Sequence, residues 1–362
     1  MEVSKHAFPY RWKISETNFT KDKGTVFSCF ACGGGSSFGY KLAGFDVIGC
    51  NEIDPKMMEA YRANHNPKYS YLEPIQTFKL RKDLPKELYN LDILDGSPPC
   101  SSFSMAGNRE KDWGKEKVFR EGQAEQVLDT LFFDFIDLAK ELQPKVVVAE
   151  NVKGLLLGEA KKYVRKIYEE FDKAGYYCQH FLLDASKMGV PQRRERVFFI
   201  CFRKDLAQKF LYNADMFTEL PKINIKFNEQ QIPFKIFKEE NNNDYPISDF
   251  YKTLWDKRKK GDTSFADING RERGKKNTGF GTNFLYYDNV CGTLTTKKDC
   301  YCLFDEPRYI SDTEAKKIGS YPQDYNFLDL KPSYLIGMSV PPVAMAQIAS
   351  RIYEQWLLKL AS

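Results

Sequence analysis

A cysteine in a stiff turn is the first candidate for chemistry in this chain. Cys100 follows Pro98 and Pro99, shortly after the apolar run 91–94, which predicts a buried strand. Proline fixes φ and removes a backbone donor, so the turn is rigid and the thiol points in one direction. Such a thiol can act as a nucleophile. On its own, however, a loop cysteine more often packs as a small apolar side chain.

Charged side chains lie at the ends of two further predicted strands. Glu150 comes directly after the run 145–149. Burial of a carboxylate at the end of a strand costs free energy, so such a group usually has a charged or hydrogen-bonding partner or a function. Arg194 and Arg196 precede the apolar run 197–202. Guanidinium groups match carbonyl oxygens and phosphates, although a solvated arginine is the commoner case. These residues are therefore candidates for binding a polar substrate.

A glycine-rich turn near the start of the chain predicts a cofactor loop. Phe30 is followed by Gly33, Gly34 and Gly35 and then by a helical segment that reaches position 42. Glycines let the backbone pass close to a ligand, and a helix N-terminus offers it free N–H donors. Glu52 ends the second predicted strand 19 positions after Gly33, near the spacing at which an acidic residue binds the ribose of an adenosine-containing cofactor.

The pattern of elements indicates an α/β fold that would gather these residues at one edge. Short apolar runs predict strands at 25–30, 46–50, 91–94 and 145–149, and amphipathic stretches predict helices at 128–142 and 160–174. Alternation of this kind is typical of a parallel sheet with helices on both faces. Right-handed crossovers then bring the carboxyl ends of the strands to the same edge.

Composition predicts a soluble cytoplasmic protein. The chain has 362 residues, 42% of them hydrophobic and 15% aromatic, which is enough for one large domain and a smaller one. We expect no membrane span and no signal peptide, because apolar runs are short and the first 23 residues are polar. Nine scattered cysteines suit a reducing compartment, and three isolated histidines predict no metal site.

Five motifs in a fixed order resemble the signature series of the DNA (cytosine-5) methyltransferases of bacterial and phage type. They are Phe30 with Gly33-Gly34-Gly35, Pro98-Pro99-Cys100, Glu150-Asn151-Val152, Gln192 with Arg194 and Arg196, and Gly337 with Ser339-Val340. The resemblance covers nearly the whole chain apart from about 204–306. It implies a Rossmann-like, S-adenosylmethionine-dependent methyltransferase sheet with a smaller, irregular target-recognition domain.

The resemblance also implies catalytic roles. Cys100 would add to C6 of a cytosine, because C5 is too poor a nucleophile to accept a methyl group unaided. Glu150 would supply a proton or hydrogen bond at N3, Arg194 would hold the O2 side of the ring, and Arg196 would help to organise the pocket. The target cytosine would have to flip out of the duplex to reach the thiol.

The implied cofactor is S-adenosylmethionine, with S-adenosylhomocysteine as the product. Phe30 would lie on the adenine, Glu52 would bind the ribose hydroxyls and Ser339 the methionine end. The other implied contacts are Gly33, Gly34, Ile53, Glu73 and Pro98. Two positions depart from the family pattern, since Cys32 and Met338 stand where the family usually has glycine and asparagine.

Double-stranded DNA is the expected partner. Residues 101–126 are expected to form a lid over the flipped base, with Ser102, Ser104 and Arg109 as DNA contacts. Residues 252–298 carry 11 basic and 5 acidic side chains, a net charge of +6 against +5 for the whole chain. Basic residues interleaved with aromatic ones suit contact with nucleic acid. We therefore expect further contacts from Lys257, Arg258 and Thr295.

The predicted organisation is a large catalytic and cofactor-binding domain (1–203), a target-recognition domain (204–307), a connector (308–336) and a segment that returns to the large domain (337–362). We expect a monomer, as is typical of the resemblance, which also implies restriction-modification; whether a cognate restriction endonuclease is a partner stays open. A transfer-RNA cytosine-5 methyltransferase is the nearest alternative, but the Cys-Phe-Thr element of that branch is absent from the small domain. A non-catalytic DNA-binding or cofactor-sensing module is the other, prompted by Cys32 and Met338.

Overall fold

The computed structural model describes residues 6–99, 116–117, 126–127, 130–158, 160–214, 219–240, 244–274, 281–297 and 299–361. Cys100, Ser102, Ser104 and Arg109 lie outside these ranges, as does nearly all of the predicted lid. The described part forms two compact units. The first comprises the described residues within 6–17, 185–194 and 228–341, and the second comprises those within 18–184, 195–227 and 342–361. This division describes packing, and the assignment of 204–307 to target recognition stays a prediction.

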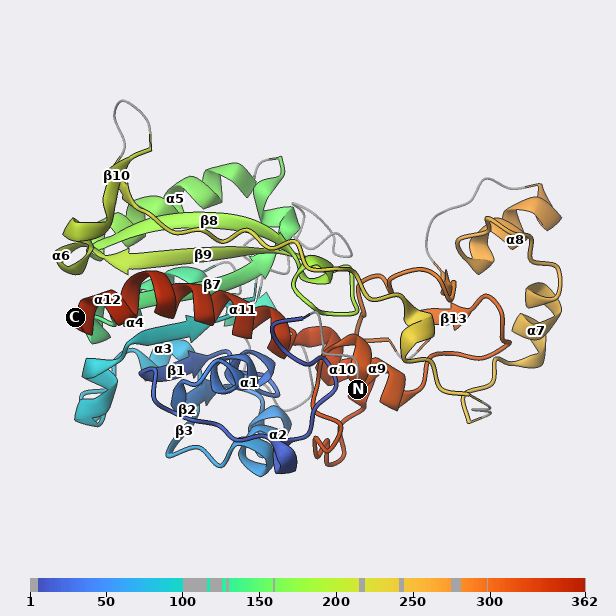
Figure 1. The fold of residues 1–362 in the computed structure, drawn as a ribbon, viewed down its shortest axis with the longest axis horizontal. Helices are drawn as coiled ribbons and strands as arrows, with labels where there is room; N and C mark the ends of the chain where they lie inside the picture. Colours follow the sequence, from blue (N-terminus) through green and yellow to red (C-terminus); the bar gives the residue numbers. More distant parts are fainter. Residues whose placement is uncertain are drawn as a thin grey trace. The chain divides into compact units, whose positions relative to one another are not determined.

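A seven-stranded sheet organises the second unit (Figure 1). Its order is β3 (Tyr69–Leu72), β2 (Asp46–Glu52), β1 (Thr25–Cys29), β4 (Ile93–Gly96), β7 (Val146–Val152), β9 (Glu195–Arg203) and β8 (Tyr176–Asp184). The first five strands are parallel, which confirms the predicted α/β sheet. β9 runs antiparallel to both β7 and β8, which the sequence pattern did not indicate.

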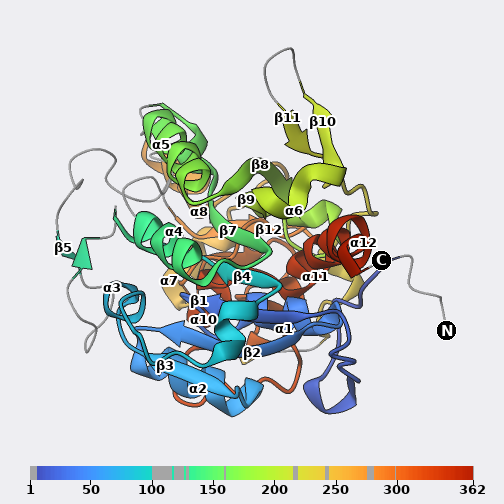
Figure 2. The ribbon, with the colours of Figure 1, turned by 90° about the vertical axis from the view of Figure 1, so that its left-hand side faces the viewer.

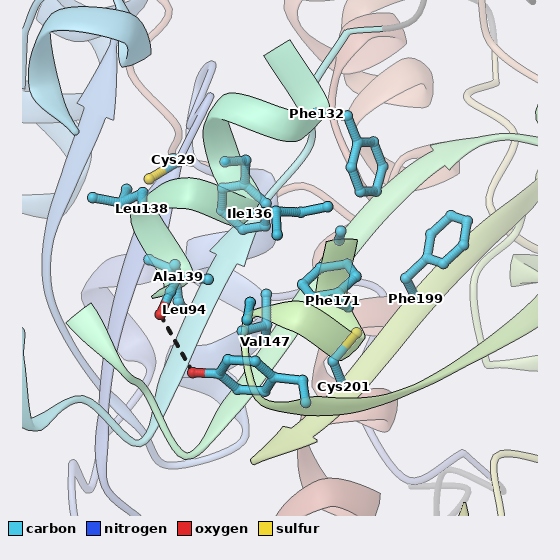
Figure 3. Close-up of a cluster of buried hydrophobic side chains, with 14 of the residues drawn as sticks. Cys29, Leu94, Phe132, Ile136, Leu138, Ala139, Val147, Phe171, Phe199 and Cys201 are labelled. Carbon is cyan, nitrogen blue, oxygen red and sulfur yellow. Dashed lines mark hydrogen bonds between the residues drawn. The ribbon is translucent and has the colours of Figure 1, made fainter. Parts of the chain in front are cut away.

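Helices cover both faces of this sheet, as Figure 2 shows: α4 (Leu131–Leu142) and α5 (Ala160–Lys173) lie on one face, and α1 (Gly35–Leu42) and α11 (Pro342–Ile352) lie on the other. On the first face, aromatic and aliphatic side chains of α4 and α5 pack on the strands, including Phe132, Ile136 and Phe171 (Figure 3). On the second face α1 and α11 meet at Gly39, where a Cβ would lie 2.4 Å from the Cβ of Met345. Close packing on both faces fixes the strand ends in place.

The remaining elements are short. In the second unit they are α2 (Pro55–His65), α3 (Ile75–Phe78), α6 (Lys204–Ala207), β10 (Leu211–Asn213), β11 (Glu219–Pro221) and α12 (Leu358–Ala361). In the first unit they are α7 (Asp249–Trp255), α8 (Phe265–Arg273), β12 (Asn283–Leu285), β13 (Tyr301–Leu303), α9 (Asp312–Ile318) and α10 (Pro332–Met338). A two-residue pair, β5 (Glu116–Lys117) with β6 (Gln126–Val127), completes the described strands.

One expectation about apolar runs is wrong. Among the described residues, the helical stretch Pro332–Leu360 is long and apolar enough to cross a membrane by length and composition alone. However, 78% of its most apolar window is buried inside the protein. The apolar side chains are accounted for by core packing, because a buried helix needs to be apolar on most of its surface.

Candidate active site

The strand register aligns residues of four strands in one row near their carboxyl ends. Cys29 at the end of β1 pairs with Asn51 of β2 and with Gly96 of β4, and Gly96 pairs with Ala149 of β7. The next residue on each strand is therefore Phe30, Glu52, Ser97 and Glu150 respectively. Three of these four were predicted as site residues from the sequence. The chain continues from Ser97 through two prolines to Cys100.

The loop after β1 is held in an unusual backbone conformation. Phe30 and Cys32 have φ values of 52° and 49°, and Gly34, the N-cap of α1, has a φ of 79°. A side chain at Gly34 is excluded, because its Cβ would lie 2.0 Å from Nε2 of His65. His65 is buried between the rings of Phe38 and Tyr61, with centroid distances of 3.8 and 4.3 Å. The sequence predicts only that His65 belongs to no ligand cluster; in the structure its ring fills the space beside Gly34 in the predicted cofactor loop.

Glu52 is buried and ties this loop to the start of α2. Its Oε2 accepts a hydrogen bond from the backbone N–H of Cys32 at 2.7 Å. Its Oε1 accepts from the N–H groups of Ile53 and Asp54 at 2.8 and 2.9 Å. Burial raises the pKa of Glu52, and these three backbone donors partly offset the rise. Oε2 keeps one acceptor position, which fits it to receive a ligand hydroxyl.

Two other predicted cofactor contacts are anchored near this row. Glu73 follows β3, and its side chain pairs with Arg81 at 2.8 Å and accepts a hydrogen bond from the hydroxyl of Thr77. The carbonyl of Pro98 accepts a hydrogen bond of 3.0 Å from the side-chain amide of Asn151 on β7. The turn before Cys100 is thus fastened to the neighbouring strand. This gives Asn151, a member of the Glu150-Asn151-Val152 motif, a definite structural role.

Glu150 and Arg196 form an ion pair on adjacent strands. Arg196 Nε lies 3.0 Å from Glu150 Oε1, and both side chains are largely buried. The pair follows from the antiparallel register of β7 and β9, in which Glu150 opposes Phe198 and Val152 opposes Arg196. Arg196 therefore holds the Glu150 carboxylate in place, while the catalytic role of either residue stays a prediction.

Asp95 is a buried carboxylate beside the candidate site that the sequence patterns did not indicate. It lies on β4, two positions before Ser97, and is only 2% exposed. Three hydroxyl groups donate hydrogen bonds to it: Ser28 and Ser36 to Oδ2, at 2.8 and 2.6 Å, and Tyr40 to Oδ1, at 3.2 Å. Burial raises the pKa of Asp95 to about 6 against the effect of these donors, and the nearby Glu150 carboxylate adds to the rise. An aspartate inside a strand gave no signal in the sequence.

The other predicted residues belong to the first unit. Buried Arg194 donates hydrogen bonds to the carbonyls of Leu294 and Gly337, at 3.3 and 3.1 Å. Gly337 packs against Thr295, where a Cβ would lie 2.5 Å from the carbonyl carbon. Ser339 is buried, and its hydroxyl donates to the carbonyl of Leu335 at 2.7 Å. Arg194 therefore links the 293–296 segment to the end of α10.

Two predicted DNA contacts already have protein partners. Lys257 pairs with Glu272 at 2.6 Å. Arg258 lies over the ring of Trp255, 3.1 Å from its centroid, and donates hydrogen bonds to the carbonyls of Phe304 and Trp255. Burial lowers the pKa of Arg258, as expected for a partly enclosed cation. Arg258 thus packs within the first unit, against Trp255 and the backbone of Phe304. DNA binding by Lys257 or Arg258 stays a prediction.

Comparison with known proteins identifies the family. Residues 24–354 match the family described as C-5 cytosine-specific DNA methylase. The chain belongs to this family. Among the relatives, the type II methyltransferase M.FnuDI of Fusobacterium nucleatum is 37% identical over 181 residues, which are 50% of this chain and 47% of that protein. The type II methyltransferase M1.HphI of Haemophilus parahaemolyticus is 28% identical over 347 residues, 91% of this chain and 87% of the relative.

Solved structures show the same fold. A DNA modification methyltransferase encoded within an Escherichia coli prophage aligns with a TM-score of 0.61 at 21% identity, covering 91% of this chain and 99% of that one. DNMT2 of Spodoptera frugiperda aligns with a TM-score of 0.59 at 18% identity, covering 90% and 98%. The M.FnuDI alignment, by contrast, spans about half the length of that relative. Membership in the C-5 cytosine methylase family thus rests on the family match, and the solved structures add the fold.

The structure explains one departure from the family pattern. Cys32 adopts the left-handed conformation that glycine adopts without strain, at the position where the family usually has glycine. Its N–H still bonds to Glu52, so the loop keeps its anchor. Met338, the second departure, is 45% exposed at the end of α10.

Substitutions at Cys32 should reveal this strain. Because a β-branched residue is strongly disfavoured at positive φ, Cys32→Val should lower the free energy of unfolding by about 1 kcal/mol or more. Cys32→Gly should leave it unchanged within about 1 kcal/mol, since relief of strain offsets the greater freedom of the unfolded chain. Urea unfolding of both variants checks this. Equal losses for valine and glycine would contradict a strained loop.

The raised pKa of Asp95 predicts a pH-dependent stability difference. The folded protein holds the Asp95 proton up to about pH 6, whereas the unfolded chain releases it near pH 4. The folded state therefore binds more protons in this window, and its stability falls as the pH rises through it. Asp95→Asn lacks the titrating group and so does not show this fall. The free energy of unfolding of the variant minus that of the unsubstituted protein should therefore be greater at pH 7.5 than at pH 4.5, by up to about 3 kcal/mol. Urea unfolding at the two pH values measures the difference, and an equal difference at both would refute it.

Proposed function

We propose that this protein transfers the methyl group of S-adenosylmethionine to C5 of cytosine in double-stranded DNA. The observation that carries the proposal is the row of strand ends that holds Phe30, Glu52, Ser97 and Glu150 at one sheet edge, in a chain of the C-5 cytosine methylase family. The row would bring residues for a cofactor and for a base to the same edge, from which the chain leads to Cys100. Ligands of open α/β sheets bind at this edge.

The residues present fit the proposed cofactor. Glu52 keeps an acceptor position for a ribose hydroxyl. Phe30 follows the neighbouring strand β1 and has a half-buried ring, whose centroid lies 6.3 Å from that of Phe135. Gly33 and Gly34 belong to the loop that leads from β1 into α1, and Ile53, Glu73 and Pro98 follow β2, β3 and β4. When bound, S-adenosylmethionine would supply an electrophilic methyl group. The role of Ser339 at the methionine end is proposed from the family motif alone.

The protein side chains would activate the base. Cys100, as the thiolate, would attack C6 of the flipped cytosine, which makes C5 nucleophilic. Glu150, oriented by Arg196, would donate a proton or hydrogen bond at N3, and Arg194 would neutralise charge developing at O2. Once C5 has been methylated, loss of its proton would restore the ring and expel Cys100. Ser102, Ser104 and Arg109 would contact the DNA around the base.

The cellular setting is part of the proposal. Several relatives are named type II methyltransferases, and others are orphan methyltransferases of Bacillus phages. We propose that the protein acts in the cytoplasm of a bacterium as a monomer, either beside a cognate restriction endonuclease or without one. Residues 204–307 would select the DNA sequence, with Lys257, Arg258 and Thr295 as candidate contacts.

Labelled methyl transfer tests this function. The protein should move tritiated methyl groups from S-adenosylmethionine to unmethylated duplex DNA, and mass analysis should identify the product as 5-methylcytosine. Cys100→Ser should abolish transfer, because a hydroxyl group is a far weaker nucleophile than a thiolate. Glu150→Gln should lower the rate by about 100-fold or more, in line with the loss of a general acid.

Controls separate this function from the alternatives. Cys178→Ser changes a buried thiol on β8 and should leave the rate within about twofold. Transfer RNA is assayed in parallel with the DNA. Label found only in transfer RNA would assign the protein to the RNA-directed branch. Binding of cofactor and DNA without any transfer would identify a non-catalytic module.

A further inference from the structure

Asp95 carries a charge that its hydrogen bonds do not require. Two serine hydroxyls donate to Oδ2 and the Tyr40 hydroxyl donates to Oδ1. An asparagine of the same shape would accept both serine bonds at its carbonyl oxygen and donate its amide to the oxygen of Tyr40. That side chain would avoid the cost of burying a carboxylate. The charge itself therefore calls for an explanation.

No basic side chain in the described part of the chain balances this charge. Asp95 accepts hydrogen bonds from the three hydroxyl groups, and the Glu150 carboxylate, which carries the same sign, adds to the rise of the pKa of Asp95. Ser36 lies in the first turn of α1, and a helix N-terminus favours a negative charge. That effect explains how the protein tolerates the carboxylate. It does not explain why an amide has not replaced it.

The position of Asp95 connects it to the proposed cofactor loop. Ser36 directly follows Gly33, Gly34 and Gly35. Its hydrogen bond of 2.6 Å connects the Asp95 carboxylate to the helix that begins at this loop. In a buried, weakly polarisable setting a charge acts over a longer range than a hydrogen bond. A cation bound on this loop would thus offset the cost of the buried carboxylate.

We propose that Asp95 is a selectivity residue of the cofactor site, whose buried charge favours the cationic sulfonium of S-adenosylmethionine over the neutral thioether of S-adenosylhomocysteine. This inference rests on the proposed function. Methyl transfer removes one positive charge from the cofactor, so the attraction to Asp95 is present before the reaction and absent after it. Asp95 would help the protein to retain the reactant and to release the product.

Calorimetric titration tests the proposal directly. Both cofactor forms are titrated at pH 7.5 into the unsubstituted protein and into Asp95→Asn. We expect the Kd for S-adenosylmethionine to rise about tenfold and the Kd for S-adenosylhomocysteine to change less than twofold. Sinefungin has an ammonium group in place of the sulfonium. Its Kd for Asp95→Asn should therefore rise as the Kd for S-adenosylmethionine does. The Tm of Asp95→Asn should be equal to or higher than that of the unsubstituted protein.

Asp92→Asn is the matched control. Asp92 precedes the same strand, accepts a hydrogen bond of 2.7 Å from the N–H of Thr25, and pairs with Lys145 at 2.7 Å. Its contacts lie at the opposite end of β4 from Ser97. Removal of this charge should lower the Tm, because a paired carboxylate is lost. It should leave the ratio of the two Kd values unchanged within a factor of two.

Three outcomes would overturn the proposal. An equal rise in both Kd values for Asp95→Asn would mean that Asp95 only shapes the loop. No change in either value would remove Asp95 from cofactor binding altogether. If the unsubstituted protein binds neither compound, the proposed function fails as well, and this result is distinct from the first two because it is visible before any variant is made.

Discussion

The register of the parallel strands is the constraint on which the rest of the site depends. Cys29, Asn51, Gly96 and Ala149 pair in one row, so the residues that follow them lie at a common level near the carboxyl ends of the strands. A shift of one residue in any strand would turn a side chain to the opposite face. The register is held by packing on both faces, with α4 and α5 on one and α1 with α11 on the other (Figure 2). The core of the second unit thus determines the chemistry available at its edge.

Several features near the carboxyl ends of these strands lower the stability of the folded protein. Glu52 and Asp95 are buried carboxylates with raised pKa values, and Phe30 and Cys32 occupy the left-handed region. Strained backbone and buried charge concentrate where a protein binds ligands, because the surrounding fold supplies the stability to hold them. Glu52 is satisfied by backbone donors and Asp95 by hydroxyls, so neither is left without hydrogen bonds. The hydrogen bonds make both charges tolerable without cancelling them.

Much of this arrangement could be predicted from the sequence. Apolar runs located the four central strands to within a few residues, and side chains at their ends, such as Glu52 and Glu150, stood out as charges beside buried segments. Asp95 and His65 could not be found in this way, because each acts through partners distant in the sequence. Ser28 and Asp95 meet only because β1 and β4 are neighbours. The antiparallel course of β9 and the inclusion of 185–194 in the first unit also depend on long-range packing.

Trapping the protein on DNA tests the central claim, that this sheet edge presents Cys100 to a flipped cytosine beside the cofactor. Duplex DNA that contains 5-fluorocytosine is incubated with the protein and S-adenosylmethionine, and the modified peptide is identified by mass spectrometry. Fluorine cannot leave C5 as a proton does, so the thiol remains bonded to C6. We predict an adduct that depends on S-adenosylmethionine, resists denaturation and maps to Cys100. An adduct on another cysteine, or none under conditions in which unmodified DNA is methylated, would contradict it.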